Sequence, residues 1–244
     1  TVEEFLTRTL TTDGALQTTG TPQNNALLSM TQNFPQLDPS RGVAEQDLIS
    51  SIYALDVLYF STSGDAWRDR TNWLGPNTPC GDVASSGAPW FGVACDADLF
   101  VTDLDLPEND LFGELPSELR ALTKLQNFVL QRNSVVGEIP AEIGNLTELL
   151  SLKYDENFIN GTLPTTIGQL TNLLNLTMSM NGQIGPIPTE IGNLLNLVHL
   201  DLQSNEFTGT IPPSLAGLQS ARKSRRKKTT SGYHEPSCDD FFSH

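Results

Sequence analysis

The stretch LDLQSNEFTGTIPPSLAGL, residues 200–218, is the last copy of a pattern that recurs every 24 residues. Each copy places an Asn, a Gly and a Pro at fixed positions. The three columns are Asn109, Asn133, Asn157, Asn181 and Asn205; Gly113, Gly137, Gly161, Gly185 and Gly209; and Pro116, Pro140, Pro164, Pro188 and Pro212. Fifteen coincidences in one register indicate a repeat architecture.

Two apolar positions separated by one residue precede each Asn, which predicts a short strand with one buried face. These pairs are Leu104/Leu106, Phe128/Leu130, Leu152/Tyr154, Leu176/Met178 and Leu200/Leu202. Further aliphatic residues follow each Gly at constant spacing. A unit of 24 residues cannot bury this surface alone, so successive units must stack and pair their strands in parallel.

The Asn column is interpreted as structural, because a buried polar side chain requires hydrogen-bond partners and a turn offers free backbone groups. The Gly and Pro columns are interpreted as turn residues that fix the bend of each coil.

The units LDLPENDLFGELPSELRALTKL (residues 104–125) and LDLQSNEFTGTIPPSLAGL resemble the plant-type leucine-rich repeat. The resemblance covers residues 101–220. It implies an α/β fold, a right-handed leucine-rich-repeat solenoid with a parallel sheet on the concave face and a helical N-terminal cap. The fourth repeat departs from the pattern, since Gln183 replaces an apolar residue. We expect Ile184 to turn inward there and the coil to be distorted.

Residues 44–60 have apolar side chains at helical spacing, and STSG follows them as a stop signal. Trp67, Trp73 and PWFGVAC (residues 89–95) come next. This segment resembles the N-terminal cap of the same family, which implies a disulfide between Cys80 and Cys95.

Four segments are therefore expected: residues 1–43, for which we expect one or two short helices and assign no function, a cap at 44–100, five repeats at 101–220 and a basic tail at 221–244, for which we predict disorder.

The chain carries a net charge of −15, with 14 basic and 29 acidic residues, which argues against nucleic acid as a partner. Six of the basic residues lie in the tail: Arg222, Lys223, Arg225, Arg226, Lys227 and Lys228. We interpret this run as a truncated or misassembled end, a natural tail or a segment that binds anionic lipid near a lost anchor, and we favour one of the first two. The chain begins with Thr1, so we expect a fragment or processed product.

Catalytic constellations are not evident in the sequence. Of the three histidines, His199 alone lies in the repeats, and no phosphate loop, metal-ligand spacing or nucleophile motif accompanies it. We expect neither an enzyme nor a cofactor or metal site.

The strand positions that point away from the core form the candidate binding surface. The predicted ligand-binding residues are Asp103, Asp105, Glu108, Asn127, Val129, Gln131, Arg132, Lys153, Asp155, Glu156, Thr177, His199 and Asp201. Six of them are carboxylates, which favours a cationic protein or peptide, although a merely solvated acidic face is the alternative. Five strands of about six residues give a sheet of roughly 480 Å², which is less than the ~800 Å² per partner of a standard interface.

Three sequons predict possible N-glycosylation, at Asn145, Asn160 and Asn175. Together with the cap disulfide and the family resemblance, they favour an extracellular or cell-surface recognition module, receptor-like or secreted, with a membrane anchor outside this fragment possible. The alternatives are an inhibitor of secreted cell-wall-degrading hydrolases, a structural or adhesive surface protein, and an intracellular protein with a basic targeting run.

Overall fold

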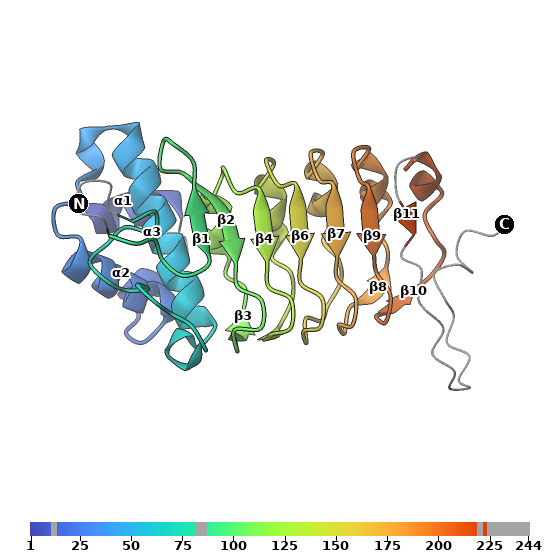
Figure 1. Ribbon diagram of the computed structural model, residues 1–244, viewed down its shortest axis with the longest axis horizontal. Coiled ribbons are helices and arrows are strands. Elements are labelled where there is room, and N and C mark those ends of the chain that lie inside the picture. Colours follow the sequence, from blue (N-terminus) through green and yellow to red (C-terminus); the bar gives the residue numbers. More distant parts are fainter. Residues whose placement is uncertain (11–13, 82–86, 219–221, 224–244) are drawn as a thin grey trace.

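The computed structural model describes residues 1–10, 14–81, 87–218 and 222–223. It is an elongated solenoid, in which helices close the N-terminal end and a row of strands follows towards the C-terminal end (Figure 1). The main sheet has the order β1-β2-β4-β6-β7-β9-β11. Its strands are Val93–Cys95, Val101–Asp105, Asn127–Val129, Ser151–Lys153, Asn175–Thr177, His199–Asp201 and Arg222–Lys223. The fold predicted from the repeats is confirmed.

The register of the sheet follows the repeat. Asp103 pairs with Asn127, Asn127 with Ser151, Ser151 with Asn175 and Asn175 with His199, so the parallel strands are offset by one 24-residue unit at each step. β1 runs antiparallel to β2 and belongs to the cap. Because each unit contributes one strand, side chains at equivalent positions form columns along the solenoid.

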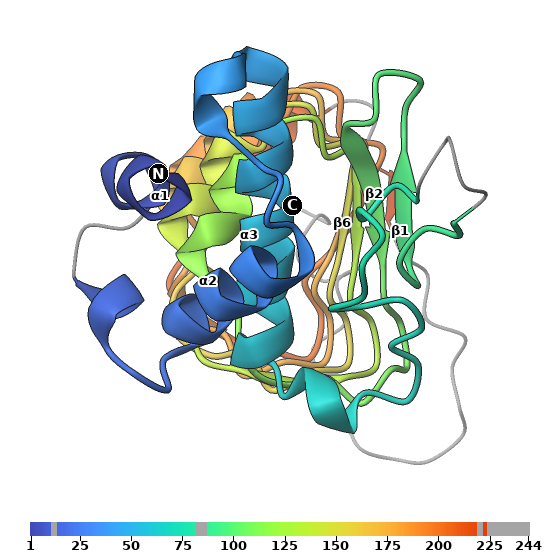
Figure 2. The same cartoon turned by 90° about the vertical axis from the view of Figure 1, so that its left-hand side faces the viewer.

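Short 3-10 helices form the convex side, opposite the sheet (Figure 2). They are η4 (Ser117–Ala121), η5 (Ala141–Asn145), η6 (Thr165–Gln169), η7 (Thr189–Asn193) and η8 (Pro213–Gly217). The aliphatic residues predicted to point inward fill the space between the helices and the sheet, and most are almost fully buried. Their removal from water is the main stabilising contribution, at about 25 cal/mol per Å² of apolar surface.

A second set of extended segments forms one flank of the solenoid. β3 (Phe112–Glu114) pairs with β5 (Ser134–Val136), and β8 (Ile184–Pro186) pairs with β10 (Glu206–Thr208), both in parallel. Residues 158–162 continue the wall between these pairs. Gly113 has a φ of 139°, and a Cβ there would collide with the Ser61 carbonyl oxygen, so glycine permits the first coil to approach the cap.

The Asn column bonds to the backbone, as predicted. Asn157 Nδ2 donates to the carbonyl oxygens of Leu130 and Tyr154 at 2.9 and 3.0 Å, and its Oδ1 accepts from the Val135 N–H at 3.0 Å. Asn133 and Asn181 repeat this arrangement in the neighbouring coils. Each Asn thus joins its own coil to the preceding one.

The cap begins with α3 (Val43–Ser61), which matches the predicted helix. η3 (Gly64–Ala66) follows, and Trp67, Trp73 and Trp90 then pack in contact with one another or with Tyr59. Each indole N–H donates to a backbone carbonyl at 2.9 Å. The disulfide implied by the family resemblance, Cys80–Cys95, is present.

The N-terminal segment adds helices outside the cap. α1 (Val2–Thr9) begins with a capping box between Thr1 and Glu4. Thr21 is the N-cap of α2 (Pro22–Asn33), and its hydroxyl accepts from the Asn24 N–H. η1 (Ala15–Gln17) lies between them and η2 (Pro39–Arg41) precedes α3. α2 packs against α3 (Figure 2), so this segment thickens the closed end of the solenoid.

The expectation for the fourth repeat is wrong. Gln183 is fully buried in the inward position, while Ile184 is 45% exposed and joins β8. Gln183 Nε2 reaches Tyr154 Oη at 3.5 Å, and Tyr154 Oη in turn donates to Met178 Sδ at 3.3 Å. The backbone of the fourth coil pairs regularly with its neighbours, so the coil is not distorted. The buried Gln183 is accommodated by its polar contact with Tyr154.

Gln183→Leu is expected to stabilise the protein by about 1–2 kcal/mol, because Gln183 Oε1 is buried without a hydrogen-bond partner. Leucine restores the aliphatic column, and Tyr154 keeps its bond to Met178. Urea unfolding measures the effect, and Ile184→Leu is the neighbouring control, for which little change is expected. A destabilised Gln183→Leu would show that the polar contact with Tyr154 contributes net stability.

Beyond the fifth repeat, β11 pairs with β9 through Arg222 and His199, one residue short of the 24-residue offset. The rest of the predicted basic tail, together with Cys238, lies outside the described residues. None of the helices in the described ranges has both the length and the apolar character needed to cross a membrane.

Candidate recognition surface on the concave face

The outward positions of β2, β4, β6, β7 and β9, with the residues that directly follow each strand, form the candidate recognition surface. The structure brings the predicted residues together on this face but at different depths. Asp105, Glu108, Arg132 and Glu156 are exposed; Asp103, Asn127, Val129, Gln131, Lys153 and His199 are half-buried; Asp155, Thr177 and Asp201 are buried. Their role in binding remains a prediction.

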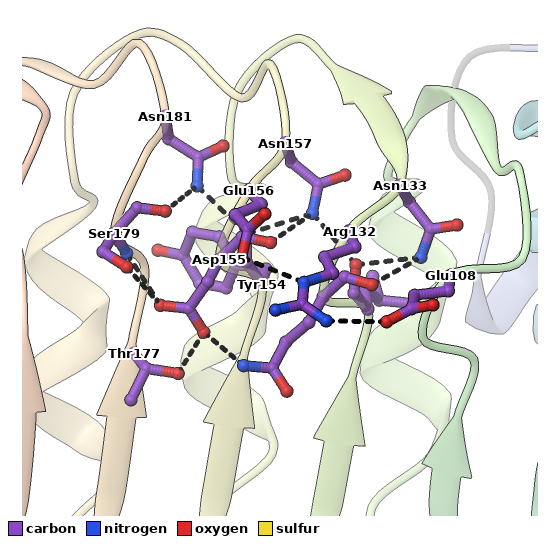
Figure 3. Close-up of polar contacts among 12 residues, drawn as sticks. Glu108, Arg132, Asn133, Tyr154, Asp155, Glu156, Asn157, Thr177, Ser179 and Asn181 are labelled. Atoms are coloured by element: carbon purple, nitrogen blue, oxygen red, sulfur yellow. Dashed lines mark hydrogen bonds and ion pairs between the residues drawn. The ribbon is translucent and has the colours of Figure 1, made fainter.

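Asp155 corrects the expected picture of six exposed carboxylates. Its side chain accepts hydrogen bonds from Thr177 Oγ1, from Ser179 Oγ and N–H at 2.9 Å, and from Gln131 Nε2 at 2.7 Å (Figure 3). Four donors on the two neighbouring coils replace water around the carboxylate. Asp155 therefore ties three coils together and is not displayed to solvent.

Asp201 is the second correction, because it is also buried. Burial raises the pKa of the Asp201 carboxyl; a hydrogen bond from the Gln203 N–H opposes this shift, and the negative charge of Asp155 adds to it. Asp201 lies on β9, and Asp155 lies two residues after the end of β6. The strand β7, which carries Thr177, lies between β6 and β9. This half of the face is polar but presents less negative charge than the sequence indicates.

Arg132 is shared between two acids on the rim of the face. Its Nη1 lies 2.8 Å from Glu108 Oε1 and its Nε lies 3.0 Å from Glu156 Oε1 (Figure 3). The three side chains come from successive coils, and hydrogen bonding to both acids raises the pKa of Arg132. Exposed pairs of this kind are screened by solvent and contribute little to stability, so a charged partner can compete for them.

The solvent-accessible acidic side chains of the face are concentrated in its N-terminal half. Asp105 is exposed, and no hydrogen bond or ion pair of its side chain occurs within the described ranges. Asp103 is half-buried and accepts from Asn127 Nδ2 at 2.6 Å and Thr102 Oγ1 at 2.8 Å. Lys153 lies near the centre of the sheet, on β6.

The three sequons occupy different sides. Asn145 is exposed at the end of η5, Asn160 is exposed on the flank, and Asn175 is half-buried in β7. A glycan on Asn175 would lie on the recognition surface, whereas the other two would leave that surface open. Glycosylation at each site stays a prediction.

Sequence reasoning missed the network of Gln131, Asp155, Thr177 and Ser179. A signal existed, because the four polar residues recur at spacings of 22 to 24 residues and so face one another in adjacent coils. No cluster of three or more His, Cys, Asp or Glu side chains suited to a metal ion occurs among the residues that the structure describes.

A family model described as Leucine Rich Repeat matches residues 196–218. No curated protein sequence matches the chain. A chain of the BIR3–SERK2 complex from Arabidopsis thaliana is similar to this chain at 32% identity, over 66% of this chain and 87% of that one, with a TM-score of 0.54.

A plant ice-binding protein is similar at 28% identity, over 68% of this chain and 51% of that one, with a TM-score of 0.60. The ectodomain of the Arabidopsis thaliana receptor kinase GASSHO1/SCHENGEN3, solved with CASPARIAN STRIP INTEGRITY FACTOR 2, matches at 44% identity with a TM-score of 0.48. This match covers 48% of this chain, which spans 14% of that ectodomain's length. With its repeat, its cap and its likeness to the BIR3–SERK2 structure, the chain belongs to the plant-type leucine-rich repeat family.

Proposed function

We propose that this chain is an extracellular protein- or peptide-recognition module, receptor-like or secreted, and that the concave face binds a cationic segment of its partner. The observation that carries the proposal is the open acid-rich half of the face around Asp105, next to a rim whose charges are held only by exposed ion pairs. Negative potential of this kind accelerates the approach of a cationic partner and helps to select it.

Two further observations support the proposal. The Cys80–Cys95 disulfide fits an oxidising compartment outside the cytosol. The similar Arabidopsis structure is a complex between BIR3 and SERK2, so a solenoid of this family takes part in protein–protein recognition there.

Charge reversal tests the binding face. An octapeptide of alternating Lys and Ser serves as the probe, and Asp105→Lys is compared with Glu142→Lys, which makes the same charge change on the convex η5. We expect Asp105→Lys to weaken binding about tenfold at low salt, since it replaces attraction by repulsion at the site, and Glu142→Lys to change it much less. Equal losses in both variants would mean that the peptide only follows the net charge, and the proposal would fail.

Inhibition of secreted hydrolases is the competing role within the same family resemblance. The purified chain is therefore assayed against a panel of cell-wall-degrading enzymes. Under the receptor-like proposal no enzyme is inhibited below micromolar concentration, and inhibition in that range would replace the proposal by the inhibitor role.

A second candidate, ice binding, follows from the likeness to the plant ice-binding protein and from one feature of this chain. Uncharged polar side chains recur at equivalent positions on and just after the convex helices: Thr123, Thr147 and Thr171 in one row, and Asn145, Gln169 and Asn193 in another. A regular array of this kind could order water. Thermal hysteresis in the presence of ice tests this candidate, and its absence would remove it.

A further inference from the structure

The flank formed by β3, β5, residues 158–162, β8 and β10 exposes large apolar side chains that the core does not use. Phe112 is 59% exposed, Phe158 is 64% exposed and Ile184 is 45% exposed. The inward positions beside them are filled by Leu111, Ile159 and Gln183, all fully buried. The exposed residues are therefore surplus to packing, and an apolar patch of this kind is typical of an interaction site.

Backbone hydrogen bonds join the segments of this flank into one continuous surface. The Phe158 N–H donates to the Val135 carbonyl at 2.9 Å, and the Ile184 N–H donates to the Gly161 carbonyl at 2.8 Å, so residues 158–162 connect the two paired segments. Glu138 lies across Gly161 of the next coil, where a Cβ would meet its Cγ at 2.5 Å. The apolar side chains are thus held on an ordered backbone.

Negative charge surrounds the apolar residues. Glu114 is paired in register with Val136, and Glu206 with Ile184. Glu114, Glu138 and Glu206 are all exposed, and in the described part of the chain none of them forms an ion pair. Lys153 is the only Lys or Arg between Asn133 and Leu218, and it lies on the concave face. The flank therefore complements a partner that is both cationic and apolar.

The flank also joins the recognition surface. Glu156 stands on the rim of the concave face, and Phe158 follows it by two residues; the Asn157 N–H reaches the Met180 carbonyl across the same rim at 3.3 Å, and Met180 is 54% exposed. Five coils and three residues per coil give the flank roughly 240 Å². Added to the concave face, this approaches the ~800 Å² that a standard interface buries per partner.

We propose that the flank is a second docking surface, which takes an extended segment of the same partner with alternating basic and apolar side chains. This inference rests on the proposed function. The ammonium groups pair with Glu114, Glu138 and Glu206 or approach the faces of Phe112 and Phe158, while the apolar side chains cover Phe158 and Ile184. A partner that spans the rim touches both surfaces.

The test compares two octapeptides of equal charge, one alternating Lys with Val and the other alternating Lys with Ser, on the full chain produced without glycans. We expect the Lys–Val peptide to bind about tenfold more tightly. The double variant Phe112→Ser/Phe158→Ser should reduce its affinity to that of the Lys–Ser peptide, and circular dichroism confirms that this variant is folded. Asp105→Lys should weaken both peptides and leave their ratio unchanged.

The outcomes separate the two claims. Equal affinities of the two peptides for the wild type, or a ratio that survives Phe112→Ser/Phe158→Ser, would overturn the flank as a docking surface and leave the concave-face proposal standing. A ratio that is lost in this double variant, combined with no effect of Asp105→Lys, would support the flank and contradict the concave face.

Discussion

Asn157→Ala is expected to lower the free energy of unfolding by about 3 kcal/mol, because it leaves buried backbone groups without partners and opens a small cavity. The Val135 N–H loses the side-chain acceptor that the structure shows for it, Asn157 Oδ1. The Leu130 and Tyr154 carbonyls each keep one side-chain donor, since Asn133 also donates to Leu130 and Asn181 also donates to Tyr154. The loss should therefore be large but not the full sum of the bonds removed.

Urea unfolding followed by circular dichroism measures this change. Asn160→Ala is the matched control, since Asn160 lies three residues away in the same coil but is exposed, and a change within about 0.5 kcal/mol is expected there. Similar losses in the two variants would contradict the role assigned to the Asn column.

Asp56→Asn is expected to remove most of the pH dependence of stability between pH 4 and pH 8. Asp56 lies on α3 and is almost fully buried, and burial raises the pKa of its carboxyl from 3.8 to about 8, against a smaller opposing effect of the Ser29 hydroxyl on α2. The folded protein then holds a proton that the unfolded chain releases near pH 4. Its free energy of unfolding falls as pH rises through this range, by up to about 1.4 kcal/mol per unit.

The measurement is the free energy of unfolding from urea titrations at several pH values. In Asp56→Asn the slope between pH 4 and pH 8 should flatten, and at pH 8 the variant should be more stable than the wild type by several kcal/mol. Asp98→Asn, on the exposed turn before β2, is the control and should keep the wild-type slope. A wild-type slope in Asp56→Asn would place the responsible group elsewhere.

The solenoid could be predicted from the sequence because its requirements recur. A residue such as Asn157 is needed in every coil for the same backbone contact, so its column is visible in one chain. Gln183 shows the limit of this reasoning. The pattern marks the position of Gln183 as inward. Only the structure shows that Tyr154 Oη lies close enough to accept a hydrogen bond from the Gln183 side-chain amide.

The recognition surface was predictable in outline but not in depth. Alternation along a strand places Asp155 and Asp201 among the outward positions but says nothing of their exposure, and both are buried. Their burial depends on how closely adjacent coils bring Thr177 and Ser179 to the carboxylate, which alternation along one strand does not encode. The helices α1 and α2 were expected only as one or two short helices without bounds within residues 1–43, because α2 has a mixed polar surface and its contacts with α3 are distant in sequence.

Hydrogen exchange on the complex with the Lys–Val octapeptide tests the proposed recognition surface most directly. We predict that the peptide slows exchange of backbone amides in β2, β4 and β6 and in residues 156–160, while η5, η6 and η7 on the convex side are unchanged. Protection confined to the convex helices, with none on the sheet, would contradict recognition through the concave face.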